Sequence, residues 1–111
     1  MKQSENFLYE SSLKWIDLGN GLRRQIMGYN DNIMLVKVEF KVGAVGTLHS
    51  HPHSQSTYVA SGVFEVTNGD EKRIVKTGDG FFAPPDLPHS VLCIEEGILI
   101  DAFNPVREDF L

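Results

Sequence analysis

Apolar and polar residues alternate along several short stretches of the chain, which is the pattern of half-buried β-strands. The clearest alternation covers residues 34–42, where Met34, Val36, Val38, Phe40 and Val42 alternate with Leu35 and three charged residues. A looser alternation covers 59–66, and short β-prone runs cover 73–76 and 81–83. Residues 97–103 are apolar at nearly every position, which predicts a strand buried on both faces.

Turn signals separate these stretches. Asn20-Gly21 and Asn68-Gly69 each stand between two apolar runs, and we expect each pair to form the centre of a type I′ hairpin turn, where both residues need positive φ. Further turns are marked by Gly78-Asp79-Gly80 and by the prolines at 84 and 85. No long stretch shows a helical period. The pattern therefore predicts an all-β sandwich or barrel of about eight to ten short strands.

Composition limits the remaining possibilities. The chain has 111 residues and 12.4 kDa, which is the size of a single domain covering residues 1–111. Its net charge of −5 argues against a nucleic-acid partner or an anionic membrane surface. No apolar run approaches the roughly 20 residues of a membrane helix, and residues 1–10 show no signal peptide. The single cysteine, Cys93, excludes an internal disulfide and favours the reducing cytoplasm.

The four histidines fall in two places. His49, His51 and His53 lie within five residues, and His89 follows a proline-rich turn. Residues i and i+2 of a strand share a face, so His49 and His51 are expected to point toward one place, while His53 follows a proline and is expected to leave the strand. Neutral imidazole is the commonest metal ligand, and Gln55 and His89 are candidates to complete the set. The alternative is that these are surface or hydrogen-bonded histidines.

The spacing of these residues resembles the two-part signature of the cupin superfamily. The matching positions are Gly43, His49, His51, Gln55 and Gly62 in the first motif, and Gly78, Pro84, Asp86 and His89 in the second. The resemblance implies a cupin double-stranded β-barrel (jelly roll), in which His49, His51, Gln55 and His89 bind one divalent transition metal. Three positions depart from the signature: Gln55 stands for Glu, Asp86 for Gly and Cys93 for Asn. The ligand types leave Mn, Fe, Co, Ni and Zn open.

The C-terminal stretch holds further candidates. Asp101 lies inside an apolar run, and a buried carboxylate is costly unless it is paired or neutralised. Such an acid has a perturbed pKa, which is typical of catalytic groups, although a structural salt bridge is the alternative. Phe103 shares its face, with core packing as the alternative, and Arg107 follows in a segment where a solvated charge would be ordinary.

Four segments are similar to the pectin degradation protein KdgF family: residues 24–28, 31–36, 49–53 and 101–111. This resemblance implies that Asp101, Phe103 and Arg107 line the cleft beside the metal. It also implies a substrate, because the family converts 4,5-unsaturated monouronates from pectin or alginate into linear 4-deoxy-5-keto uronates. We therefore expect a metal-dependent enzyme acting on a small anionic sugar. A cupin dioxygenase and a non-catalytic sugar-binding cupin are the alternatives.

The expected layout is an N-terminal arm of about residues 1–20 before a barrel core at about 33–104. The arm carries Phe7, Leu8, Tyr9 and Trp15. A second copy of the chain would remove this apolar surface from water and so stabilise a small barrel. We therefore expect a homodimer.

Overall fold

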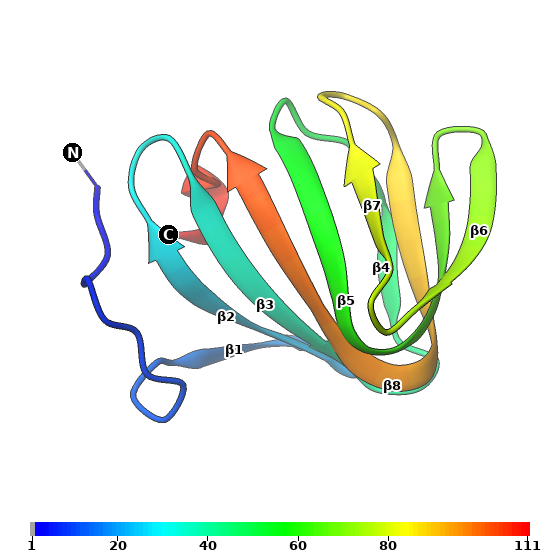
Figure 1. The fold of residues 1–111 in the computed structure, drawn as a ribbon, viewed down its shortest axis with the longest axis horizontal. Coiled ribbons are helices and arrows are strands. Elements are labelled where there is room, and N and C mark those ends of the chain that lie inside the picture. The colour runs from blue at the N-terminus through cyan, green and yellow to red at the C-terminus, as the bar shows by residue number, and fades with distance from the viewer. Residues whose placement is uncertain (1) are drawn as a thin grey trace.

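The computed structural model describes residues 2–111; Met1, the first residue of the expected domain, lies outside the described residues. Every strand pairing is antiparallel, and the one helical element of the described chain is a 3₁₀ turn at Glu108–Phe110. The all-β prediction is confirmed. The strands are β1 (Trp15–Gly19), β2 (Leu22–Tyr29), β3 (Met34–Phe40), β4 (Val45–His49), β5 (Ser54–Asn68), β6 (Glu71–Lys76), β7 (Gly80–Ala83) and β8 (His89–Asn104) (Figure 1). No helix in the described residues has the length and apolar character to cross a bilayer.

Two long strands, β5 and β8, hold the sheet together by passing through both of its layers. The first half of β5 pairs with β7 and with the second half of β8, which continues to β3, β2 and β1. The second half of β5 pairs with β6 and with the first half of β8, whose other neighbour is β4. The sheet thus curls into two facing layers (Figure 1). Its terminal strands β1 and β6 do not pair, so the ladder does not close into the ring that a complete barrel requires.

Glycines make the fold of these strands possible. At Gly97 of β8, an added Cβ would lie only 2.0 Å from the Ser61 carbonyl oxygen. At Gly62 of β5, φ is +93°, and an added Cβ would lie 2.7 Å from backbone atoms of β8. The two strands therefore cross their bend in backbone contact, which only residues without a side chain allow. This bend is why the apolar runs at 59–66 and 97–103 are each only part of a longer strand.

The two Asn-Gly turns differ. Asn20 and Gly21 both have positive φ, 53° and 83°, as predicted for a type I′ turn. At the second turn Asn68 instead pairs with Glu71 as the last residue of β5. The central residues are Gly69, with φ of 63°, and Asp70, so the predicted turn is displaced by one residue and has glycine at its first central position, as a type II′ turn does.

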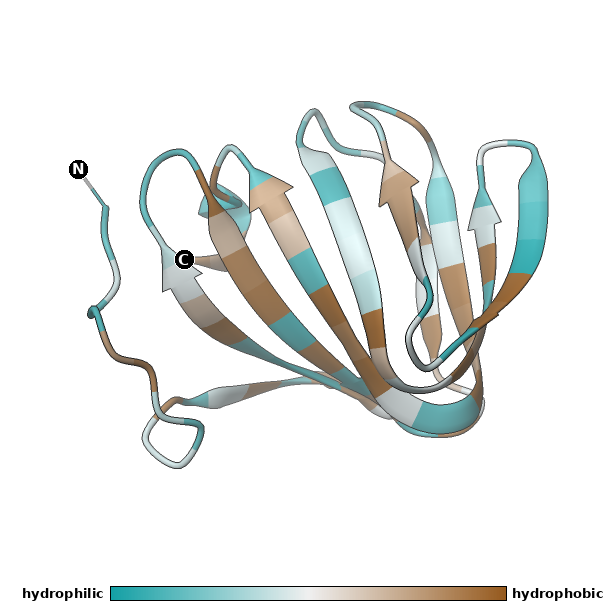
Figure 2. Cartoon of the chain, viewed as in Figure 1, coloured by the Kyte–Doolittle hydropathy of each residue, from teal (hydrophilic) through white to brown (hydrophobic). Residues whose placement is uncertain are grey.

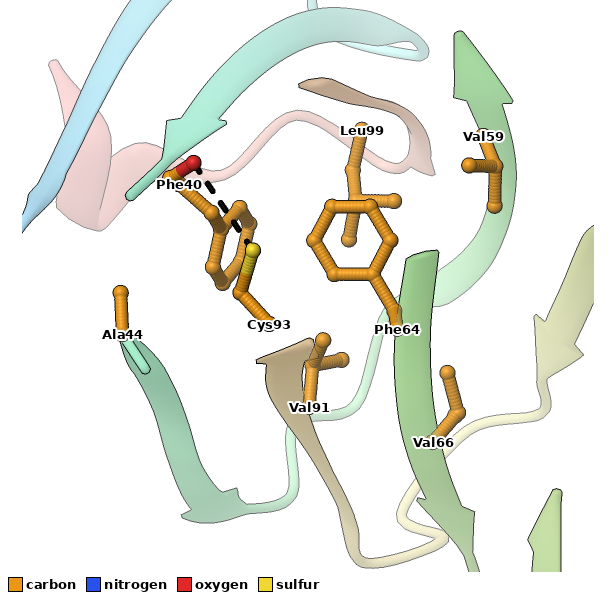
Figure 3. Close-up of a cluster of buried hydrophobic side chains, with 8 residues drawn as sticks. All are labelled: Phe40, Ala44, Val59, Phe64, Val66, Val91, Cys93 and Leu99. Carbon is orange, nitrogen blue, oxygen red and sulfur yellow. Dashed lines mark hydrogen bonds between the residues drawn. The ribbon is translucent and has the colours of Figure 1, made fainter. Parts of the chain in front are cut away.

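The interior between the layers contains two apolar clusters. The larger one includes Phe40 and Phe64, whose rings meet edge to face at 5.2 Å (Figure 3). The smaller one consists of Met34, Val36, Phe103 and Val106. Along much of β3, brown apolar bands alternate with teal polar ones (Figure 2). The expectation that residues 97–103 are buried on both faces is wrong, because Leu99 and Phe103 are buried while Ile98, Ile100 and Ala102 are partly exposed on the outer face.

Candidate functional site

Three histidines converge where β4 ends and β8 begins. His49 closes β4 and lies opposite His89, the first residue of β8. His51 lies beyond β4, in the segment that leads to β5, so the expectation that His49 and His51 share one strand is wrong. The rings nevertheless meet, with centroids 4.4 Å apart for His49 and His89 and 5.0 Å apart for His51 and His89. One ring nitrogen from each lies within 4.8 Å of the others.

Backbone carbonyls fix the orientation of all three rings. In each, Nδ1 is within hydrogen-bond distance of a carbonyl oxygen two residues away, which favours protonation of Nδ1 and leaves Nε2 as the nitrogen that can bind a metal. The distances are 2.7 Å from His49 to Thr47, 3.1 Å from His51 to His53 and 2.9 Å from His89 to Leu87.

The donor set fits a divalent transition metal. His89 is 2% exposed, and its Nε2 is buried without a hydrogen-bond partner in the described chain. Burial lowers the pKa of both His89 and His51, which favours the neutral imidazole that binds metals. A buried lone pair without a donor costs free energy unless something positive faces it. These three nitrogens could therefore hold a metal ion, and their type does not select one element.

Gln55, near the start of β5, presents its amide oxygen to the same point. Its side chain is buried, and Oε1 lies 2.9 Å from His51 Nε2. The amide nitrogen donates to Thr57 Oγ1 at 3.0 Å and to Asp101 Oδ1 at 3.4 Å. With the NH₂ group held on one side by these acceptors, the oxygen faces the histidines, where it could act as a neutral metal ligand.

Asp101 lies behind Gln55 on β8, directly opposite Thr57 of β5. Thr57 Oγ1 donates to Asp101 Oδ1 at 2.7 Å, so both hydrogen bonds of the carboxyl group reach the same oxygen. Burial raises the pKa of Asp101 to about 6, against the opposing effects of the Thr57 hydrogen bond and the Arg107 charge. The carboxyl group is therefore able to exchange a proton near neutral pH.

A cavity of about 410 Å³ opens beside these groups, within the size range of small-molecule sites. His49, Gln55, His89 and Asp101 line it together with Phe103 and Arg107. Arg107 is 8% exposed, and its Nε and Nη2 donate to the two carboxylate oxygens of Asp109 at 3.0 and 2.8 Å. Its guanidinium also lies over the rings of Phe103 and Phe110. Arg107 is thus not the freely solvated tail charge that was the alternative.

Comparisons with known proteins agree with this geometry. The cupin domain family matches residues 36–100. The pectin degradation protein KdgF of Dickeya dadantii is 46% identical over 107 residues, covering 95% of this chain and 97% of that protein. This chain belongs to the KdgF family of cupins. Among solved structures, an RmlC-like cupin from Shewanella frigidimarina is 44% identical, with a TM-score of 0.97 and full coverage of both chains. The structure of KdgF from Halomonas sp. is 38% identical, with a TM-score of 0.92, and the match covers 97% of this chain and 100% of that one.

The family membership confirms the resemblance carried by the two sequence motifs. Within this cupin, the structure brings the predicted residues His49, His51, Gln55, His89, Asp101, Phe103 and Arg107 to one end of the space between the layers. His53 packs against His51, with ring centroids 5.4 Å apart, but it does not belong to the group of three whose nitrogens converge. Its Nε2 contacts the Val106 carbonyl oxygen at 3.2 Å, which ties the histidine segment to the C-terminal segment.

Sequence reasoning missed Thr57 and Arg24. Thr57 is two residues after Gln55 on the same strand, so its position on the same face could have been inferred from the period of two. Arg24 lines the same cavity from β2. Its signal was its place between Leu22 and Ile26, which are apolar at the same period.

Proposed function

We propose that this cupin converts 4,5-unsaturated monouronates, released during breakdown of pectin or alginate, into linear 4-deoxy-5-keto uronates. The observation that carries the proposal is the shared cavity, in which a three-histidine cluster and a buried acid lie beside an arginine. The similarity to the pectin degradation protein KdgF over nearly the whole chain supports the same substrate class.

We assign His49, His51, Gln55 and His89 to one divalent transition metal. When bound, the metal would act as a Lewis acid that offsets the charge of the substrate carboxylate and favours deprotonation of the water that adds to C5. Because three imidazoles and one amide carry no charge, they leave the charge of the cation undiminished. The net charge of the chain is −5, so an anionic sugar needs such local positive charge to enter the cavity.

In this proposal, Asp101 moves the proton. Both of its hydrogen bonds reach Oδ1, which leaves Oδ2 to deliver a proton to C4 of the enol ether. Water then adds to C5, and the Asp101 carboxylate takes up the proton that the water releases. The hemiketal formed at C5 opens to the ketone as the C5 hydroxyl group loses its proton and the ring oxygen, still on C1, gains one. The aldehyde hydrate left at C1 then loses water, and Asp101 ends in its starting state.

Arg107 and Phe103 position the substrate in this proposal. Arg107 is held by Asp109 through Nε and Nη2, so it acts on the substrate through its positive charge and its remaining Nη1 donor. Phe103 is only 3% exposed and contacts His51 edge to face at 5.7 Å. It therefore forms a firm wall behind the histidines and supports Arg107, rather than offering a broad stacking surface.

The deciding experiment is a turnover assay. Metal-loaded protein is incubated with 4,5-unsaturated galacturonate, and loss of the conjugated chromophore is followed in the ultraviolet. A chelated sample and an enzyme-free blank are the controls. We expect metal-dependent loss faster than the blank, and loss at the blank rate with bound metal verified would refute the proposed function. Asp101→Asn tests the proton-transfer role, since near-normal turnover in that variant would remove Asp101 from it.

A further inference from the structure

Arg24, which lines the cavity, has no carboxylate partner within 4.0 Å, whereas the other three arginines of the described chain each form an ion pair. Arg24 lies on β2 between Leu22 and Ile26, whose side chains pack against the two apolar clusters. Because alternate residues of a strand share a face, Arg24 occupies an inward position in an otherwise apolar row. A charge in such a place is costly unless an opposite charge meets it.

No carboxylate lies within ion-pair distance of Arg24 among the described residues, although the charge of Asp109 acts on it from further away and raises its pKa. Arg24 forms no ion pair within 4.0 Å in the described chain, and its Nε is buried without a hydrogen-bond partner. Its guanidinium lies 3.7 Å over the Phe110 ring. Burial, followed by the charge of Arg107, lowers the pKa of Arg24, as expected for a cation that is poorly compensated. The adjacent Arg23 faces outward and pairs with Glu39 at 2.8 Å.

The other arginine of the cavity is already engaged. Arg107 uses Nε and Nη2 on Asp109, the same two-point contact that a substrate carboxylate would need. The guanidinium groups of Arg24 and Arg107 both lie over the Phe110 ring. Two cations are therefore held on one aromatic side chain at the cavity wall, and Arg24 is the one with free donors.

We propose that Arg24 binds the carboxylate of the anionic substrate and thereby selects uronates over neutral sugars. The inference rests on the proposed function only for the identity of the substrate class. Its physical basis is that a planar guanidinium with an unpaired donor offers a carboxylate charge-assisted hydrogen bonds inside a cavity of suitable size.

The test is the affinity of the metal-loaded protein for galacturonate, a saturated uronate, with galactose as the neutral comparison, both measured calorimetrically. Arg24→Met should weaken galacturonate binding by about 10- to 100-fold, the loss expected for a hydrogen bond between charged groups. Galactose binding should stay unchanged, and Arg24→Lys should recover part of the galacturonate affinity. Arg23→Met is the matched control, since it removes a neighbouring charge on the opposite face, and it should leave both affinities unchanged.

Equal galacturonate affinity in Arg24→Met and the native protein would overturn the inference. So would an equal loss of galactose affinity, because a purely structural role predicts that loss. Melting temperature provides a check on folding, and removal of an uncompensated cation should not lower it. The assay needs no turnover: native protein that binds galacturonate through Arg24 but fails to open the unsaturated uronate would refute the proposed function and uphold this inference. In the turnover assay, Arg24→Met should raise KM much more than it lowers kcat.

Discussion

Replacing Gly97 with alanine tests whether the bend of β5 and β8 is what assembles the site. The first half of β8 supplies His89 and the second half supplies Asp101. These residues reach one cavity only because the strand folds back between them. An alanine Cβ at position 97 would lie 2.0 Å from the Ser61 oxygen, whereas ordinary van der Waals contact begins at 3.4 Å.

The loss of stability in Gly97→Ala depends on which atoms must move to make room for the new Cβ. The clashing atom belongs to backbone, so the two strands have to separate. Separation breaks the hydrogen bond from Ile98 N–H to Ser61 Oγ, now 3.1 Å, together with the neighbouring ladder contacts. A buried polar group left without its partner costs about 1–3 kcal/mol, so loss of two such contacts amounts to about 2–6 kcal/mol. That is a large part of the roughly 5–15 kcal/mol by which a domain is stable.

Urea unfolding followed by circular dichroism measures this free energy. Gly46→Ala is the matched control, because an added Cβ in β4 meets nothing closer than 3.8 Å. We expect it to change the free energy of unfolding by less than about 1 kcal/mol. If Gly97→Ala unfolds within about 1 kcal/mol of Gly46→Ala, the bend tolerates a side chain and the reasoning is wrong.

Three further predictions concern the site and the surface. A divalent transition metal at 100 times its Kd should stabilise the native protein by about 2.7 kcal/mol, seen as a higher melting temperature; His89→Ala should abolish this increase, and an equal increase in both proteins would exclude His89 as a ligand. Thr57→Val keeps the shape of the side chain but removes the hydroxyl group bound to Asp101, the proposed catalytic acid, so kcat should fall by about tenfold or more. The melting temperature should fall as well, because the Gln55 amide loses an acceptor, and unchanged kcat in the folded variant would contradict this role. Phe7 and Tyr9 are 78% and 64% exposed, and we expect sedimentation velocity to show a dimer. Replacement of both residues by serine should shift the protein to monomer, and a monomeric native protein would rule out the homodimer.

Local patterns in the sequence predicted those strands and turns that depend only on neighbouring residues. Alternation identified β3, and the Asn20-Gly21 pair identified its turn, because period and positive φ depend on neighbouring residues. The Asn68-Gly69 turn was misplaced by one residue because strand register, which depends on long-range pairing with β8, decides where β5 ends. The site was predictable only in part for the same reason. His49 and His51 meet although they do not share a strand.

The resemblance to a family predicted that His89 lies in the same site as His49 and His51, although it is about 40 residues away in the sequence. The period of the strands could not predict this. Arg24 lies in the similar segment 24–28, but the resemblance assigned it no role. Its place in the site became clear only when the structure showed that its Nε is buried without a partner. Thr57 was missed because its role depends on the cross-strand neighbour Asp101, and that register is set by the whole of β5 and β8. The sequence alone does not show which strands pair or in which register.

Two buried polar atoms without partners line the same cavity, and they are of opposite kinds. His89 Nε2 offers a lone pair, which needs a cation or a donor, whereas Arg24 Nε–H needs an anion or an acceptor. Each costs the free protein about 1–3 kcal/mol, so apolar residues at both positions would make a more stable fold. A metal ion with a carboxylate ligand satisfies both at once: the cation meets the imidazole and the anion meets the guanidinium. One ligand pair would thus give both atoms a partner, whereas a bare metal site would leave the Arg24 Nε–H group unpaired.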